Sequence, residues 1–190
     1  MKNQNIKIII AVAIFAFLLP LCNVHGREIT LDNAPSQVCF TPGEDCTGLI
    51  VDTIRAARKE ILVQAYGFTS KPIAEALVKA HKRGVQIVAV LDRSNDPTGS
   101  YRKKKKYTAA AFLANMGIPT YIDSNHKIAH NKVMVIDNGT VITGSFNFTH
   151  SAQKDNAENV LIIKDEKLAK GYKANFETHL QHSEKISSNY

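Results

Sequence analysis

Residues 60–92 read EILVQAYGFTSKPIAEALVKAHKRGVQIVAVLD and contain two apolar runs on either side of a helical pattern. The runs at 60–66 and 85–92 are almost continuously apolar, which is typical of strands that are buried on both faces. Between them, Pro72 lies in the first turn of an expected helix and Gly84 lies at its end. This order of strand, helix and strand predicts a right-handed crossover between parallel strands.

Further strands and helices extend this alternation. Asn138 and Gly139 separate the two strands of an expected hairpin, and both residues tolerate the positive backbone angles of a tight turn. The pattern predicts an α/β fold, with a mixed, largely parallel β-sheet flanked by helices on both faces. The other expected elements are strands at 37–41, 132–137, 140–144 and 158–165, and helices at 47–58, about 108–115 and 166–181.

The N-terminus has the features of a secretory signal peptide. A short basic region precedes an uncharged apolar run at 8–22, and Gly26 is a small residue at a suitable cleavage point. A retained membrane anchor is the alternative, although this run is shorter than the ~20 residues that a membrane span needs. We expect residues 1–26 to direct export to the periplasm or the medium, and residues 27–190 to form a single domain.

The charge of the chain favours an anionic partner, which is either nucleic acid or a membrane surface. The chain has 24 basic and 17 acidic residues; cleavage would remove two lysines and no acidic residue, so the net charge would fall from +7 to +5. One basic run lies between Tyr101 and Tyr107, whose rings would stack on bases. It is expected to bind a phosphate backbone and consists of Arg102, Lys103, Lys104, Lys105 and Lys106.

Two cysteines, Cys39 and Cys46, remain after the expected signal segment. They flank a Pro-Gly turn, and in an oxidising compartment they would close a small disulfide loop. Two unpaired buried thiols are the alternative.

Four polar residues are expected to meet at the open end of the predicted hairpin. Side chains at i and i+2 of a strand point the same way, so His130 and Lys132 project together, and so do Ser145 and Asn147. An imidazole, an ammonium group, a hydroxyl and an amide supply a nucleophile and donors for anionic oxygens. The pattern indicates attack on a phosphodiester.

The motifs in this region resemble those of the phospholipase D superfamily. HNKVMVID (130–137) resembles its His-x-Lys-x4-Asp motif, and GSFNFT (144–149) resembles the element that follows it. AYGFTS, RGVQIVAVLDRSN and AENV extend the similarity over nearly the whole of residues 27–190. The resemblance is greatest to small, exported bacterial members with one motif, which include nonspecific endonucleases and secreted proteins named phospholipase D.

The resemblance implies a role for each motif residue. His130 would attack phosphorus to form a phosphohistidine, while Lys132 and Asn147 hold the phosphate oxygens and Ser145 supports them. Glu158 would accept a hydrogen bond from the second ring nitrogen of His130. A sixth motif residue, Asp137, has the opposite strand parity, so it is expected to order the hairpin.

The leaving alkoxide needs a proton while His130 is occupied as the nucleophile. Since the chain has one His-x-Lys motif, we expect a homodimer in which His130 of a second copy supplies that proton.

No cofactor or metal is expected. His126 and His130 lie four residues apart and His179 and His182 three apart, but the sequence offers no evident acidic or cysteine partner for either pair.

The expected activity is that of a phosphodiesterase, most simply an endonuclease acting on DNA or RNA. Phospholipase D activity on phosphatidylcholine-type lipids is the alternative. A secreted binding protein with an inactive site is disfavoured, because every motif position is filled.

Overall fold

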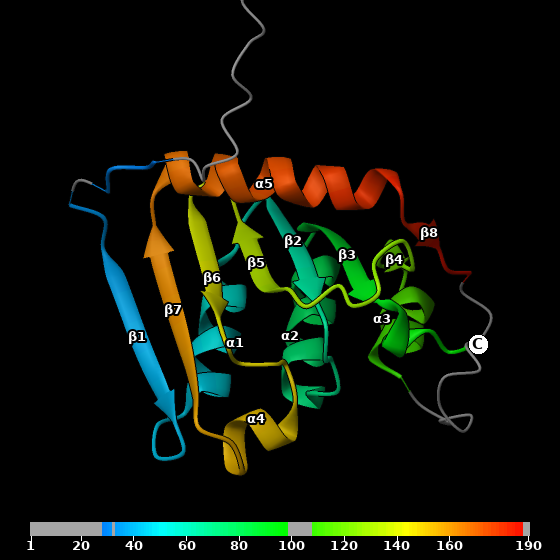
Figure 1. Cartoon of the computed structure of the whole chain (residues 1–190), viewed down its shortest axis with the longest axis horizontal. Coiled ribbons are helices and arrows are strands. Elements are labelled where there is room, and N and C mark those ends of the chain that lie inside the picture. Colours follow the sequence, from blue (N-terminus) through cyan, green and yellow to red (C-terminus); the bar gives the residue numbers. More distant parts are fainter. Residues whose placement is uncertain (1–27, 32, 99–107, 188–190) are drawn as a thin grey trace, which may run out of the picture.

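The computed structural model describes residues 28–31, 33–98 and 108–187. Its strands are β1 (Ser36–Thr41), β2 (Glu60–Ala65), β3 (Gln86–Asp92), β4 (Thr120–Asp123), β5 (Lys132–Ile136), β6 (Thr140–Gly144), β7 (Glu158–Lys164) and β8 (Glu184–Lys185). Its α-helices are α1 (Cys46–Ala56), α2 (Lys71–Lys82), α3 (Ala109–Asn115), α4 (His150–Lys154) and α5 (Glu166–Gln181). The strands form one sheet in the order β1-β7-β6-β5-β2-β3-β4-β8 (Figure 1).

The directions of the strands follow from their connections. β2, β3 and β4 are parallel neighbours, and α2 links the first two as the crossover predicted. The other described pairs are antiparallel. The mixed sheet is therefore confirmed, but the expectation that it is largely parallel is wrong, since two of the seven described pairs are parallel. Hairpins and strands that return along the sheet pair antiparallel, and only crossover connections make parallel neighbours.

Helices cover both faces of the sheet, as predicted. The larger core contains Ile54 of α1, Leu77 of α2 and Leu113 of α3. The smaller core lies on the other face, where Phe176 of α5 packs with strand residues such as Leu62. In Figure 1, α1 and α2 lie behind the sheet and α5 runs across its upper part. Successive residues of a strand alternate between these cores, which explains why the central strands are apolar at nearly every position.

Four short elements and one turn differ from the sequence-based expectations. β4, the 3-10 helix η1 (Arg93–Asn95), α4 and β8 were not predicted, because periodicity cannot be recognised over the two to five residues that each contains. In the β5–β6 hairpin, positive φ angles fall on Asp137 (53°) and Asn138 (58°). The expected pair was Asn138 and Gly139. The turn is shifted by one residue because the Asp137 carboxylate is anchored to the start of β2.

Cys39 and Cys46 form a disulfide, as predicted, which joins β1 to the first residue of α1. The expected signal segment (1–26) and the basic run Arg102–Lys106 lie outside the described residues, so both stay predictions. No helix in the described part of the chain has the length and apolar character needed to cross a bilayer.

Candidate active site

Strand ends gather at one end of the sheet. The parallel register that aligns Asp92 with Asp123 brings the ends of β3 and β4 together. β5 begins beside them, since Lys132 pairs with Ala65 at the end of β2. β6 ends at Gly144. Because β5 and β6 are antiparallel, this end of β6 lies on the same side of the sheet as the start of β5. Ligands of open α/β sheets bind at the carboxyl ends of parallel strands, so the polar residues here are candidates for a site.

The ring of Tyr66 brings the two residues of the His-x-Lys motif together. Its centroid lies 4.7 Å from that of the His130 ring. The Nζ atom of Lys132 lies 5.2 Å from the centre of the same tyrosine ring, within cation–π range. Lys132 Nζ also donates a 2.9 Å hydrogen bond to the carbonyl of His130. The His130 side chain remains exposed to solvent and is therefore accessible to a substrate.

Lys132 is only 7 % exposed, which is unusual for a lysine. Burial lowers the pKa of its ammonium group below the ordinary value, and the Glu158 carboxylate opposes this shift. An ammonium group with little surrounding water attracts a phosphate oxygen more strongly than an exposed one does. This lysine is thus suited to hold a phosphodiester.

Ser145 and Glu158 form a hydrogen-bonded group at the β6–β7 end. The Oγ of Ser145 donates to Glu158 Oε2 at 2.6 Å and accepts from the backbone N–H of Asn159 at 3.1 Å. The Oε1 of Glu158 accepts from the Asn156 amide at 2.9 Å. Both carboxylate oxygens of Glu158 thus accept hydrogen bonds from nearby residues of the chain. Contrary to expectation, the described residues show no hydrogen bond between Glu158 and the ring of His130.

Asn147 lies against the residue that follows Tyr66. A Cβ added to Gly67 would lie 3.3 Å from both Cγ and Oδ1 of Asn147, so glycine permits this close approach. Within the described part of the chain, Asn147 Oδ1 is buried without a hydrogen-bond partner. Leaving a buried polar group unpaired costs about 1–3 kcal/mol. The unpaired atom is a carbonyl oxygen, which accepts hydrogen bonds, and the Nδ2 group of the same amide carries the donors.

Asp137 lies apart from the other motif residues, at the opposite end of β5 from Lys132. Its carboxylate accepts hydrogen bonds of 2.7–3.0 Å from the backbone N–H groups of Arg58, Lys59 and Glu60. The structure does not bring Asp137 to the candidate site. Its position agrees with the expected role in ordering the hairpin.

The chain matches the family model described as "Cardiolipin synthase, PLD-like domain" over residues 50–180. The chain belongs to the phospholipase D superfamily. This phosphodiesterase is 44 % identical over 162 residues to a phospholipase D of Rickettsia prowazekii, a match that covers 85 % of this chain and 76 % of that protein. It is 28 % identical over 140 residues to the mitochondrial cardiolipin hydrolase of Homo sapiens, covering 73 % and 53 % of the two chains.

Among solved structures, the phospholipase D-superfamily fold is shared with Nuc, a phospholipase D family member from Salmonella typhimurium. The two chains are 36 % identical, with a TM-score of 0.73, and the match covers 82 % of this chain and 99 % of Nuc. NucT from Helicobacter pylori, at 21 % identity and a TM-score of 0.70, shows the same fold, covering 80 % of this chain and 99 % of NucT.

Three residues that sequence reasoning did not select contact or hold the segments of the candidate site. Tyr66 contacts both His130 and Lys132, as described above. The side chain of Asn95 accepts from the N–H of Phe68 and donates to the carbonyl of Tyr66, which fixes the segment after β2. Asp92 is the third, and it binds the backbone beside His130. The sequence offered one signal for these residues, since each is polar or aromatic and lies at or after the end of a buried strand. It did not indicate which residues they contact.

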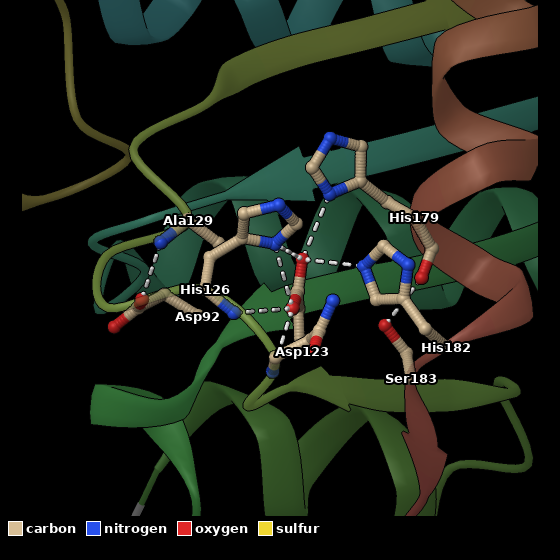
Figure 2. A network of polar contacts seen from close by, with 8 residues as sticks. Asp92, Asp123, His126, Ala129, His179, His182 and Ser183 are labelled. Atoms are coloured by element: carbon tan, nitrogen blue, oxygen red, sulfur yellow. Dashed lines mark hydrogen bonds and ion pairs between the residues drawn. The ribbon is translucent and has the colours of Figure 1, made fainter.

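A second polar cluster of this phospholipase D-superfamily protein surrounds Asp123 at the end of β4 (Figure 2). Its Oδ2 atom lies 3.0 Å from Nδ1 of His126, 2.8 Å from Nδ1 of His179 and 3.3 Å from Nε2 of His182. Burial alone would raise the pKa of Asp123, but hydrogen bonds from His179, His126 and His182 outweigh it and lower the pKa to about 2.

The Asp123 cluster corrects one sequence-based argument. An acidic partner does complete a ligand set for His126 and for the His179–His182 pair. Asp123 lies three residues before His126, so this spacing was an available signal, but His179 and His182 join it only where α5 meets β4 in the folded chain. His130 is not part of this ligand set. Whether the phosphodiesterase reaction proceeds without a metal stays a prediction.

Proposed function

We propose that the chain hydrolyses phosphodiester bonds through a covalent intermediate on His130. The single observation that carries this proposal is the meeting of His130, Lys132 and the Asn147 amide around Tyr66 and Gly67. An exposed imidazole beside a buried ammonium group provides a nucleophile and a cation for the phosphate, and the Nδ2 group of Asn147 can donate to a phosphate oxygen.

The reaction has two displacement steps. A ring nitrogen of His130 attacks phosphorus, a nitrogen–phosphorus bond forms, and the bond from phosphorus to the leaving oxygen breaks as that oxygen takes a proton. Water then attacks the phosphohistidine, loses a proton to a base, and returns the free imidazole. Lys132 and Asn147 hold the non-bridging oxygens in both steps. Glu158 contributes by fixing Ser145 and by favouring the charged form of Lys132.

We also propose that two copies of the chain complete one site. His130 cannot protonate the leaving oxygen while it attacks phosphorus, and the chain has one His-x-Lys motif. Its exposed position allows His130 of a second copy to face it across a two-fold axis, where it would act first as an acid and then as a base.

Nucleic acid is the proposed substrate class. The whole chain has a net charge of +7, and a positive surface concentrates polyanions and strengthens phosphate contacts. Export, proposed from the sequence of residues 1–26, fits the Cys39–Cys46 disulfide.

Phospholipid is the second candidate substrate. Ile128, two residues before His130, is 53 % exposed and would offer one apolar contact to a lipid surface. The names of the relatives from Rickettsia and of the mitochondrial relative also point to lipid substrates.

The deciding experiment offers the purified chain single- and double-stranded DNA and, separately, vesicles of phosphatidylcholine and of cardiolipin. We expect cleavage of DNA, no formation of phosphatidic acid from either lipid, and loss of all turnover in His130→Asn. Cleavage of lipid alone would replace nucleic acid with phospholipid. Turnover by His130→Asn at the wild-type rate would refute the covalent route.

Trapping the intermediate tests the mechanism independently of substrate preference. With a substrate labelled at phosphorus, the denatured wild-type chain should carry acid-labile label on His130, and His130→Asn should carry none. For the dimer, sedimentation should give twice the chain mass, and a fully active monomer would contradict the shared site.

A further inference from the structure

Two segments that are far apart in the sequence, 123–126 and 179–182, deliver four ligand atoms to one point. Asp123 ends β4, His126 belongs to the following loop, and His179 and His182 lie at and just after the end of α5. The three rings point toward the Asp123 carboxylate (Figure 2). One carboxylate oxygen and three imidazole nitrogens all lie within 4.8 Å of one another.

We propose that Asp123, His126, His179 and His182 form a Zn²⁺ site, separate from the phosphodiester site around Tyr66. Three imidazole nitrogens and one carboxylate oxygen suit the tetrahedral coordination of structural zinc. Zn–N and Zn–O bonds of about 2.0–2.1 Å place neighbouring ligand atoms roughly 3.3 Å apart. The distances of 2.8–3.3 Å from Asp123 Oδ2 to the three nitrogens are close to this value.

Hydrogen bonding alone satisfies this arrangement poorly. The two oxygens of a carboxylate offer about four acceptor positions. In addition to the three imidazoles, the backbone N–H groups of Asn125 and His126 approach Oδ1 of Asp123 at 3.2 and 3.4 Å. All three rings lie near Oδ2, and Nδ1 of His126 also lies 3.1 Å from Oδ1, so five donors share about four acceptor positions. A cation among the ring nitrogens would instead accept their lone pairs and leave Oδ1 to the backbone.

The cluster combines a buried anion with access from solvent. The Asp123 side chain is 0 % exposed, whereas the side chains of His126, His182 and His179 are 43 %, 27 % and 15 % exposed. Zn²⁺ would therefore reach the site from solvent on the side where the histidines are exposed, and would bind the buried carboxylate of Asp123. Neutral imidazoles are needed for coordination, so binding displaces any ring proton that the site holds.

Zinc at this position would join the end of α5 to the loop at 124–131, which contains His130. The opposite end of that loop is already held by the bond from Ala129 to Asp92. The ion would act on the structure of the loop, and its detection does not depend on any enzymatic activity.

The test uses the full chain purified without a polyhistidine tag and stripped with a chelator that is then removed. Titration calorimetry with Zn²⁺ and elemental analysis should show one ion per chain, and the melting temperature should rise with Zn²⁺ concentration. Co²⁺ bound in its place should give the strong visible bands of tetrahedral coordination.

The His126→Ala, His182→Ala double variant should lose Zn²⁺ affinity by about 100-fold or more, together with the melting shift and the Co²⁺ bands. These side chains are partly exposed, so removing them leaves few packing contacts to lose. His150→Ala is the matched control, because His150 is exposed and lies outside the cluster, and it should bind as the wild type does.

Two results would overturn the proposal. One is a wild-type chain that binds no Zn²⁺. The other is a double variant that binds as tightly as His150→Ala, which would place the ion elsewhere. Circular dichroism of each variant without metal checks its fold, and the single variant His126→Gln tests the same ligand if the double variant does not fold.

Discussion

The Oδ2 atom of Asp92 accepts a 2.8 Å hydrogen bond from the backbone N–H of Ala129, the residue before His130. Asp92 is 2 % exposed at the end of β3, and its other oxygen accepts from the N–H of Ser94. A buried carboxylate on a different strand thus fixes the backbone beside the proposed nucleophile.

Removing this carboxylate should impair turnover more than substrate binding. We expect Asp92→Ala to lower kcat about 10- to 100-fold with little change in KM, because the imidazole of His130 loses its fixed position. The unpaired N–H of Ala129 should also reduce the free energy of unfolding by about 1–3 kcal/mol. Steady-state kinetics and urea unfolding measure both effects. Asp92→Asn keeps an acceptor and serves as the control; equal kcat in wild type and Asp92→Ala would contradict the positioning role.

Glu158 should extend activity toward alkaline pH. Burial lowers the pKa of Lys132, and the carboxylate of Glu158 opposes this. Glu158→Gln removes the opposing charge, so the pKa of Lys132 should fall further and the ammonium group should deprotonate at lower pH. The alkaline limb of the kcat/KM profile should then move to lower pH. A limb that stays in place, in a variant that folds normally, would show that Lys132 does not control it.

Asp137 should stabilise the fold in a pH-dependent way. Burial would raise its pKa, but hydrogen bonds from the N–H groups of Lys59, Arg58 and Glu60 outweigh this and lower it. A carboxyl group whose pKa is lower in the folded state stabilises above the unfolded pKa, and this stability is lost as pH falls through the folded pKa.

We therefore expect Asp137→Ala to reduce the free energy of unfolding by about 1–3 kcal/mol at neutral pH. The difference from wild type should shrink below about pH 5, where the unfolded carboxyl group begins to protonate. Urea unfolding across this range measures it, with the exposed Asp52→Ala as the control. A difference that is constant with pH would rule out the carboxylate as its source.

Gly144 should tolerate no side chain. Its φ is +150°, and a Cβ would overlap the backbone carbonyl of Asn159. Gly144→Ala should reduce the free energy of unfolding by more than about 2 kcal/mol and disturb the bond from Asn159 to Ser145. Gly139→Ala is the control, because its nearest contacts are 3.9 Å away, and it should change stability by less than about 1 kcal/mol. Equal thermal unfolding of the two variants would contradict this account.

Local patterns were sufficient to predict most of the fold. The apolar runs of β2 and β3, the cap and glycine of α2, and the hairpin at 137–139 each depend on neighbouring residues. Short elements such as β4 were missed, and the share of parallel pairs was overestimated, because pairing direction depends on the path of the whole chain. The shifted turn has the same origin, since Asp137 binds residues that lie far from it in sequence.

The sequence by itself determined which residues could do phosphodiester chemistry, because the motif residues lie within a few positions of the predicted hairpin. Strand periodicity does not link them, since His130 lies before β5 and Ser145 and Asn147 lie after β6. Only the tertiary structure decided their partners. Tyr66 between His130 and Lys132 and Glu158 on Ser145 are contacts between strands. The histidines around Asp123 come together for the same reason, because α5 packs across the sheet and no spacing rule relates residues so far apart.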